Sequence, residues 1–366
     1  MTTREKTRKV SVGNLIIGGG NPIRVQSMTQ TKTKDIKSTI KQIRELEKVG
    51  CEIIRVTVPD MESARAIGEI KKQIKIPLVA DIHFQYLLAI EAVNQGVDKV
   101  RINPGNIGGE DKIKAVVKVC KEKNVSIRVG INTGSLEKDL FAKYGQYGVA
   151  RVMIESATRQ VNILEKLNFR SFIMSLKCSD CLVARDAYKL FAERFNYPLH
   201  VGITEAGPSM AGIIKSAIGI GGILSDGIGD TIRVSTSSDP KEQIKIGWEI
   251  LKSLGLRQRG INIISCPTCG RTEIDLIGLA QKVEKILENV DAPLNVAVMG
   301  CVVNGPGEAS FADIGLCGGK KQGAIFKKGQ LIRTVTEKDI LPVFMVEIKK
   351  LLTERGYEKQ IKNIRL

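Results

Sequence analysis

Short β-branched apolar runs alternate with longer amphipathic segments through roughly the first two thirds of the chain. Each run ends in a polar residue or a turn marked by Gly or Pro, and the segments between carry apolar residues at helical spacing. That alternation predicts consecutive strand–helix units. The predicted strands are residues 23–29, 52–58, 77–82, 99–103, 126–131, 172–177, 199–204 and 231–237, and the first helix carries Ile36, Ile40, Ile43 and Leu46.

Eight such units in succession predict a closed (β/α)8 TIM barrel of the α/β class, with an open doubly wound sheet as the weaker alternative. The periodicity stops near residues 255–260, so the expected domains are a barrel over 1–255 and a small α+β domain over 260–366. The second domain is expected to contain strands at 261–265 and 294–299, a helix at 272–287 and a Gly-rich stretch at 300–319. Short strands near 324–326 and 331–334 and a helix at 337–355 complete it.

A positive charge interrupts five of the predicted barrel strands, although buried parallel strands normally consist almost wholly of apolar residues. Barrel active sites lie at the carboxyl ends of the strands, where converging cations repel one another unless an anion lies between them. For any one of these residues alone, extension of the side chain to the solvent-exposed rim, or pairing with a carboxylate such as Asp60 or Glu205, would account for the charge equally well. Together they favour a phosphate or diphosphate site lined by Arg55, Arg101, Arg128, Lys177 and Arg233.

Other polar residues follow the same strand ends and complete the predicted pocket. Glu205 is the best candidate for a proton donor, because it places a carboxyl group at the barrel mouth. His83 lies on the catalytic side, whereas His200 begins a strand and is expected to be structural. The remaining polar residues at these strand ends are Asp81, Asn103, Asn132 and Ser235.

Composition is consistent with an anionic ligand. The chain has 366 residues with 56 Lys and Arg against 39 Asp and Glu, giving a net charge of +17 that attracts anions. Aromatic residues make up only 4% of the chain, which leaves few platforms for stacking nucleic-acid bases. The N-terminus is charged, and no apolar stretch approaches the ~18–20 residues of a membrane span. We therefore expect a cytoplasmic protein that binds neither nucleic acid nor membrane.

The cysteines point to a metal centre in the second domain. In a reducing compartment, closely spaced cysteines indicate metal or redox chemistry more often than disulfides. Cys266 and Cys269 form a CxxC, and Cys301 follows the next predicted strand. Three cysteines without a complementary histidine fit an iron–sulfur cluster at least as well as zinc. Either Cys317 or Glu308 is the fourth ligand, and an exchangeable carboxylate oxygen would leave an iron open to substrate.

The other four cysteines have no matching pair. Cys178 and Cys181 form a second CxxC at the end of a barrel strand, where partly buried free thiols are expected. Cys51 and Cys120 are interpreted as packing residues.

Six motifs spread over nearly the whole chain resemble those of the 4-hydroxy-3-methylbut-2-enyl diphosphate synthase family in its compact bacterial form. These are iron–sulfur enzymes of the non-mevalonate isoprenoid pathway. The motifs are RVQSMT at 24–29, ADIH at 80–83, RINPGNIG at 101–108, RVGIN at 128–132, CPTCGR at 266–271 and GCVVNGPGE at 300–308.

The resemblance implies a 4Fe–4S cluster held by Cys266, Cys269, Cys301 and Glu308. It implies reductive ring opening of 2-C-methyl-D-erythritol 2,4-cyclodiphosphate, with loss of water and with ferredoxin or flavodoxin as the electron donor. The cluster domain would be similar to the sulfite-reductase repeat and would close over the partner's barrel in a head-to-tail homodimer. The diphosphate pocket would be formed by Arg55, Arg101, Asn103, Arg128, Asn132, Lys177, Arg233 and Ser235.

Two other functions are compatible with parts of the pattern. The positive charge and four cysteines would suit a nucleic-acid-binding barrel with a structural zinc domain, but no groove-reading element can be identified. A pterin- or corrinoid-type methyltransferase barrel would share the fold, but fold alone argues function poorly and the cysteines would have no role.

Overall fold

The computed structural model describes residues 4–102, 107–303 and 305–364. The chain divides into two compact units, Met1–Arg257 and Gln258–Leu366, a division that lies between the predicted domain limits at residues 255 and 260. Each unit has its own hydrophobic core. In the described part of the chain, no helix combines the length and the apolar character needed to span a membrane.

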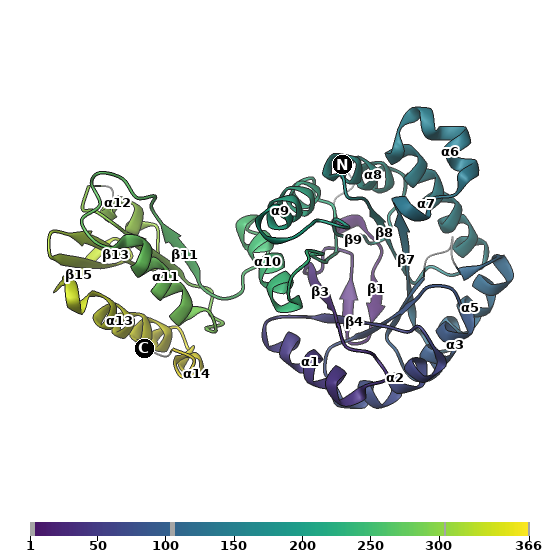
Figure 1. Cartoon of the computed structure of the whole chain (residues 1–366), viewed down its shortest axis with the longest axis horizontal. Helices are drawn as coiled ribbons and strands as arrows, with labels where there is room; N and C mark the ends of the chain where they lie inside the picture. The colour runs from purple at the N-terminus through teal and green to yellow at the C-terminus, as the bar shows by residue number, and fades with distance from the viewer. Residues whose placement is uncertain (1–3, 103–106, 304, 365–366) are drawn as a thin grey trace. The chain divides into compact units, whose positions relative to one another are not determined.

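The first unit is the predicted TIM barrel (Figure 1). Its eight strands are all parallel, in the order β8-β7-β6-β5-β4-β3-β10-β9. An isolated parallel bridge between Met174 and Leu199 joins the two ends of that order, so the sheet closes and is not an open doubly wound one. The strands are β3 (Arg24–Met28), β4 (Ile53–Thr57), β5 (Leu78–Ile82), β6 (Lys99–Ile102), β7 (Ser126–Asn132), β8 (Phe172–Lys177), β9 (His200–Val201) and β10 (Thr231–Ile232).

Helices surround this barrel and several begin at an aspartate. Asp35, Asp180 and Asp239 each accept a hydrogen bond from a backbone N–H of the first turn, which satisfies a donor that the helix itself leaves free. Asp60 does the same for Ser63 at 2.8 Å, so it caps a helix and does not pair with a barrel arginine. The helices are α1 (Ile36–Lys48), α2 (Met61–Gln73), α3 (Tyr86–Asn94), α5 (Glu110–Glu122), α6 (Lys138–Tyr144), α7 (Val149–Lys166), α8 (Cys181–Arg194), α9 (Ser209–Ser225) and α10 (Pro240–Ser253).

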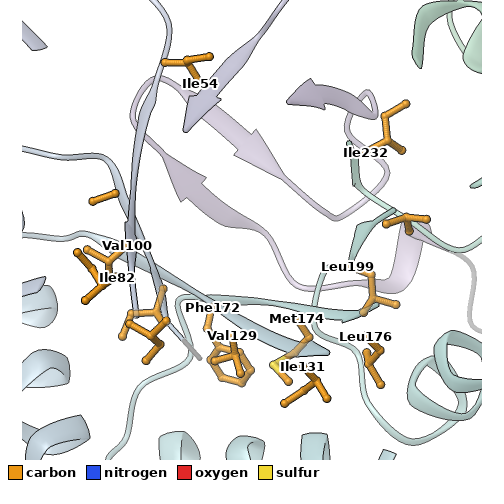
Figure 2. Close-up of a cluster of buried hydrophobic side chains, with 14 of the residues drawn as sticks. Ile54, Ile82, Val100, Val129, Ile131, Phe172, Met174, Leu176, Leu199 and Ile232 are labelled. Atoms are coloured by element: carbon orange, nitrogen blue, oxygen red, sulfur yellow. The ribbon is translucent and has the colours of Figure 1, made fainter. Parts of the chain in front are cut away.

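Alternation along the strands separates an apolar outer layer from a polar interior. Val100 and Val129 belong to the large core between strands and helices, with side chains from neighbouring strands beside them (Figure 2). Successive residues of a strand point to opposite faces, so Lys99, Arg101 and Arg128 point into the barrel. The charges that interrupt the apolar runs therefore all lie on one side of the sheet.

A short hairpin that the sequence analysis did not identify closes the amino-terminal end of the barrel. Strands β1 (Val10–Val12) and β2 (Leu15–Ile17) pair antiparallel. Val10, Val12 and Ile17 form one buried cluster with residues from the first halves of three barrel strands, Ile53, Val79 and Ile173. The barrel thus has an apolar floor.

The last two strands are shorter than predicted. Residues 199–204 and 231–237 were expected as strands, but pairing is confined to β9 and β10. The Arg233 N–H still donates to the Val201 carbonyl at 2.9 Å, and both segments then continue as loops. Arg233 and Ser235 therefore follow a strand and do not lie within it.

The second unit is a five-stranded sheet in the order β11-β12-β13-β14-β15, parallel at first and antiparallel from β13 onward. Apolar residues of α11 and α13 pack on one face, and α12 covers part of the other. The elements are β11 (Asn262–Ser265), α11 (Leu276–Leu287), β12 (Asn295–Met299), α12 (Gly305–Ser310), β13 (Ile314–Gly319), β14 (Gln322–Lys327), β15 (Gln330–Thr336), α13 (Ile340–Glu354) and α14 (Glu358–Ile361).

One prediction for this unit was wrong in detail, and one stretch that was predicted only as Gly-rich proves to be structured. The helix expected from residue 272 begins at Leu276, because Asp275 accepts a hydrogen bond from the Gly278 N–H and caps it there. The Gly-rich stretch 300–319 contains a helix and a fully buried strand.

Candidate active site

The cations predicted for the barrel mouth come together around one buried carboxylate. Arg101 Nη1 lies 3.0 Å from Asp81 Oδ1, and Arg55 Nε lies 3.7 Å from Asp81 Oδ2. His83 Nε2 lies 3.4 Å from Asp81 Oδ2 and 3.3 Å from Arg101 Nη1. Burial alone would raise the pKa of Asp81, but Arg55, the His83 hydrogen bond and Arg101 together hold it below its usual range. Asp81 is therefore ionised and orients both arginines.

Arg128 lies in the barrel interior without a compensating charge of its own. Only 2% of it is exposed, and neither its Nε nor its Nη1 has a hydrogen-bond partner among the described residues. Burial, and then repulsion from Arg55 and Arg101, lowers the pKa of Arg128 well below its ordinary value. Such a donor needs a partner that the described protein atoms do not provide.

Lys177 and Arg233 add to the same excess of positive charge. Burial lowers the pKa of Lys177 well below its usual range, and Arg128 and Arg233 lower it further. Burial, with Arg55 next, lowers the pKa of Arg233 to about 9. Among the described residues, Asp81 is the one carboxylate that forms an ion pair with any of the five cations. The mouth is thus strongly positive and suited to an anion.

A glycine in the loop after β9 gives one of these cations its space. A Cβ on Gly202 would lie 2.6 Å from Lys177 Nζ and 2.5 Å from the Arg233 carbonyl oxygen. Any side chain at this position would displace either Lys177 or the backbone. This glycine therefore lets Lys177 lie against the barrel wall.

The other predicted residues of the mouth are less enclosed. Asn132 ends β7 half-buried, paired in register with Lys177. Ser235 is also half-buried, and Glu205 is exposed in the loop after β9. Glu205 has a φ of +53°, a strained conformation for a non-glycine residue that is found preferentially at functional sites. Asn103 lies outside the described residues.

Two residues that the sequence analysis did not select also face the barrel interior. The Met28 sulfur accepts hydrogen bonds from Arg55 Nε at 3.2 Å and Nη2 at 2.9 Å. Lys99 is fully buried two residues before Arg101. A charge inside an apolar strand is the signal that identified Arg101, and it applies equally to Lys99. No comparable signal singles out Met28.

The two histidines lie where the sequence analysis expected them. His200 is fully buried at the start of β9, and its Nδ1 lies 2.8 Å from the Thr231 hydroxyl oxygen. Burial, with Lys177 next, lowers the pKa of His200 well below its usual range, so the ring is neutral. His83 is exposed at the mouth.

In the second unit the candidate ligand loops meet at the carboxyl ends of β11 and β12. The Gly300 N–H donates to Cys266 Sγ at 3.4 Å, and the Gly300 carbonyl accepts from the Glu273 N–H at 3.0 Å. A Cβ on Gly300 would lie 2.9 Å from Thr272 Cγ2, so glycine is needed for this close approach. The loop that carries Cys266 and Cys269 therefore lies directly beside Cys301.

The two candidates for a fourth ligand differ in accessibility. Cys317 is fully buried within β13 beneath α12, and a Cβ on Gly305 would lie 2.7 Å from its sulfur. Burial, together with the neighbouring Cys301 and Cys266 thiols, raises the pKa of Cys317 to about 12. Glu308 is exposed on α12.

The chemistry of this donor set suits an iron–sulfur cluster. Cys266 and Cys301 are half-buried and Cys269 is exposed, and all three are free thiols. A hydrogen bond from the Arg271 backbone N–H, together with the Arg271 charge, lowers the pKa of Cys269 and favours its thiolate. Over the residues that the structure describes, no three acidic, histidine or cysteine side chains converge closely enough for a single metal ion. A cluster of several atoms requires ligands that are farther apart than that.

The remaining cysteines lie in the first unit and are also free. Cys51, Cys120 and Cys178 are buried, and Cys181 is half-buried with its Sγ 3.3 Å from the Lys215 carbonyl oxygen.

The closed parallel barrel, the cation-lined mouth and the separate cysteine-bearing unit define a two-unit TIM-barrel protein. Two family models match it, the GcpE TIM-barrel domain over residues 7–248 and the GcpE protein C-terminal domain over residues 262–350. The chain belongs to the GcpE family.

Similar proteins cover almost the whole chain. One from Bacillus mycoides (strain KBAB4) is 52% identical over 98% of this chain and 98% of its own length. One from Geobacillus kaustophilus (strain HTA426) is 54% identical over 98% of this chain and 96% of its own. One from Thermodesulfovibrio yellowstonii is 51% identical over 96% of this chain and 100% of its own. All three are named 4-hydroxy-3-methylbut-2-en-1-yl diphosphate synthase (flavodoxin).

Among solved structures, the dihydropteroate synthase of Yersinia pestis has a TM-score of 0.46 and 10% sequence identity, over 68% of this chain and 98% of that one. This likeness is too weak to bear on function.

Proposed function

We propose that the cations of the barrel mouth hold the diphosphate of the substrate while the cysteine loops of the second unit hold the redox centre. The enzyme is an oxidoreductase of the non-mevalonate pathway. It opens the ring of 2-C-methyl-D-erythritol 2,4-cyclodiphosphate reductively, with loss of water, to give 4-hydroxy-3-methylbut-2-enyl diphosphate. A nucleic-acid-binding protein with a structural zinc domain and a methyltransferase, the two alternative functions, would not catalyse this reaction.

The unpaired arginine in the barrel interior carries the proposal. Arg128 is buried, and two of its guanidinium nitrogens lack partners among the described residues. A diphosphate supplies acceptor oxygens and negative charge in one group, and guanidinium–phosphate hydrogen bonds are among the strongest in proteins. Lys177 and Arg233 would contribute further donors. The arrangement is fixed before the ligand arrives, so little reorganisation opposes binding.

Asp81 acts as a positioning residue in this account. It pairs with Arg55 and Arg101 on neighbouring strands and so fixes the directions of both guanidinium groups. His83, beside the same carboxylate, would present its ring at the edge of the pocket. Asn132 and Ser235, at neighbouring strand ends, would add uncharged donors to the phosphate oxygens. We assign Asn103 to the same pocket on the family motif alone.

Glu205 is proposed as the proton donor. The reaction adds two electrons, breaks a carbon–oxygen bond of the ring and releases another oxygen as water, so a proton must reach the departing oxygen. Glu205 is a carboxyl group on the mouth side of the barrel, in a loop with strained backbone at that residue. A positioned carboxyl group is a suitable general acid for such a step.

Cys266, Cys269, Cys301 and Glu308 are proposed to hold a 4Fe–4S cluster. Such a cluster supplies single electrons and an iron to which an oxygen can bind. The thiols hold it firmly, whereas a carboxylate ligand exchanges more readily. We prefer Glu308 to Cys317 as the fourth ligand, because Glu308 is exposed and Cys317 is covered by α12.

Replacing these two residues separately should distinguish them. Glu308→Ala should lose turnover while it retains much of its iron and sulfide, because three thiolates still hold the core. Cys317→Ala should change activity little. Turnover together with the visible spectrum of each anaerobically purified variant measures both effects. Loss of the cluster in Cys317→Ala with normal activity in Glu308→Ala would reverse the ligand assignment.

The electron donor is proposed to be a flavodoxin, following the names of the relatives, with ferredoxin as the second candidate. A head-to-tail homodimer, a likeness of the second unit to the sulfite-reductase repeat and a cytoplasmic location stay predictions.

The direct test of the proposal is turnover in vitro. Anaerobically reconstituted protein, given reduced flavodoxin and the cyclic diphosphate, should release the linear allylic diphosphate. Protein with Arg65→Ala, an exposed arginine on α2, is the control for a general effect of lost charge. If the cyclic diphosphate binds normally to a variant that lacks the positive charges of both Arg128 and Lys177, the proposed pocket is wrong.

A further inference from the structure

The barrel interior holds a second polar layer directly beneath the cation-lined mouth. Lys99 begins β6 and points to the same side of that strand as Arg101, two residues further along. Its register partner on β7 is Ser126, just as the partner of Arg101 is Arg128. Lys99 therefore lies one layer below the arginines, toward the amino-terminal end of the barrel.

Lys99 cannot reach solvent or a protein acceptor. It is 0% exposed, and its Nζ has no hydrogen-bond partner among the described residues. Its register partner on β5 is Val79, which belongs to the apolar cluster that the β1–β2 hairpin forms with Ile53 and Ile173. Lysines normally extend along apolar surface until the ammonium group reaches water, and that route is closed here.

Other buried polar groups of the barrel strands do not balance a charge on Lys99. Gln26 on β3 and His200 on β9 are buried, and the Gln26 amide atoms and His200 Nε2 have no partners among the described residues. The neutral His200 ring adds no charge. Asp98 lies immediately before β6, and its Oδ2 lies 2.5 Å from Lys71 Nζ and 2.7 Å from the Leu78 backbone N.

The charges at the barrel mouth are almost all positive. Arg55, Arg101, Arg128, Lys177 and Arg233 project from β4, β6, β7, β8 and the end of β10, and Asp81 on β5 is the one carboxylate paired with them in the described residues. Burial first, and then repulsion from Arg128 and Arg55, lowers the pKa of Lys99 to about 7, with Asp98 partly opposing this shift. The amine is thus close to losing its proton, first because it is buried and second because cations lie nearby.

We propose that Lys99 is a proton-binding site coupled to the barrel mouth, and that it takes up a proton when the cyclic diphosphate binds there. This inference rests on the proposed function. The two negative charges of the ligand offset the repulsion from Arg128 and Arg55, and the ammonium form of Lys99 then becomes the stable one. By linkage, binding must weaken as the pH rises above the value at which the free enzyme loses this proton.

The ligand itself suits the measurement. Each phosphorus of a cyclic diphosphate carries one strongly acidic proton, so the ligand does not titrate near neutral pH. Calorimetric titrations at pH 8 in two buffers of different ionisation enthalpy therefore count protons taken up by the protein. Lys99 alone should contribute ~0.9 proton at that pH, since pH 8 lies about one unit above the pKa of Lys99 in the free enzyme.

Two variants separate this site from the other groups that titrate. Lys99→Met keeps the length of the side chain without the amine and should take up ~0.9 proton fewer than the wild type. Lys72→Met replaces an exposed lysine on α2 and should match the wild type. Any uptake at Lys177 remains in both variants and cancels in the comparison.

Equal proton uptake by Lys99→Met and the wild type would overturn the inference while leaving the proposed function intact. Absence of binding by the wild-type protein would overturn the proposed function instead. If circular dichroism finds Lys99→Met unfolded, Lys99→Gln takes its place in the same comparison. In either case the affinity of the wild type should fall close to tenfold per pH unit between pH 8 and 9, and a flat profile contradicts the inference.

Discussion

Glu205→Gln should bind the cyclic diphosphate as the wild type does and turn it over ~10²–10⁴-fold more slowly, the range typical for loss of a general acid. The amide keeps the size of the side chain and the backbone conformation, but it has no proton to give to the departing oxygen. Binding is measured by calorimetry and turnover by release of the linear diphosphate under saturating reduced flavodoxin.

The matched control for Glu205→Gln is Glu69→Gln on the outer helix α2. This control should retain wild-type turnover. The iron and sulfide content of Glu205→Gln should equal that of the wild type, because the loop after β9 belongs to the first unit. A Glu205→Gln enzyme that is slow only because it binds substrate poorly would contradict the proposed role of this residue.

Arg128→Ala should instead weaken substrate binding. Loss of one charge-assisted phosphate contact costs ~1.5–3 kcal/mol, so the affinity for the cyclic diphosphate should fall roughly ten- to a hundredfold. The cluster spectrum should not change. The variant is expected to fold, because it removes a buried cation that the described residues do not compensate.

Arg128→Lys and Arg65→Ala are the controls for this experiment. The lysine restores charge without the two-pronged donor geometry, so its affinity should lie between those of the wild type and Arg128→Ala. Arg65 is exposed on α2, and its removal should have no effect. If Arg128→Ala binds normally and loses only the rate, then Arg128 is not the anchor for the diphosphate.

The residues of the mouth could be predicted because they break a strong pattern. Arg101 and Arg128 interrupt runs of apolar residues, and strand periodicity directs both to the inner face of the barrel. The carboxylate that lies among these arginines was less predictable. Asp60 is a carboxylate at a strand end just as Asp81 is, but Asp60 is the N-cap of α2 and Asp81 reaches the arginines. Only the three-dimensional structure shows which of these two carboxylates pairs with an arginine.

Other features could not be predicted because the local signal is weak or misleading. The hairpin at the barrel floor consists of two three-residue strands, which are too short for a periodic pattern. Strand β13 has the sequence IGLCGG, in which three of six residues are glycines, and Gly315 lets Ala309 of α12 approach closely. Its low β-propensity is overridden by burial on both faces, so the sequence resembles a loop.

Analysis of iron, acid-labile sulfide and zinc in the anaerobically purified protein most directly tests the central claim that the cysteine-bearing unit holds a catalytic cluster. The account predicts a brown protein with iron and sulfide in equal amounts, both lost when Cys266, Cys269 and Cys301 are replaced together. A colourless protein that contains zinc and no sulfide would contradict it.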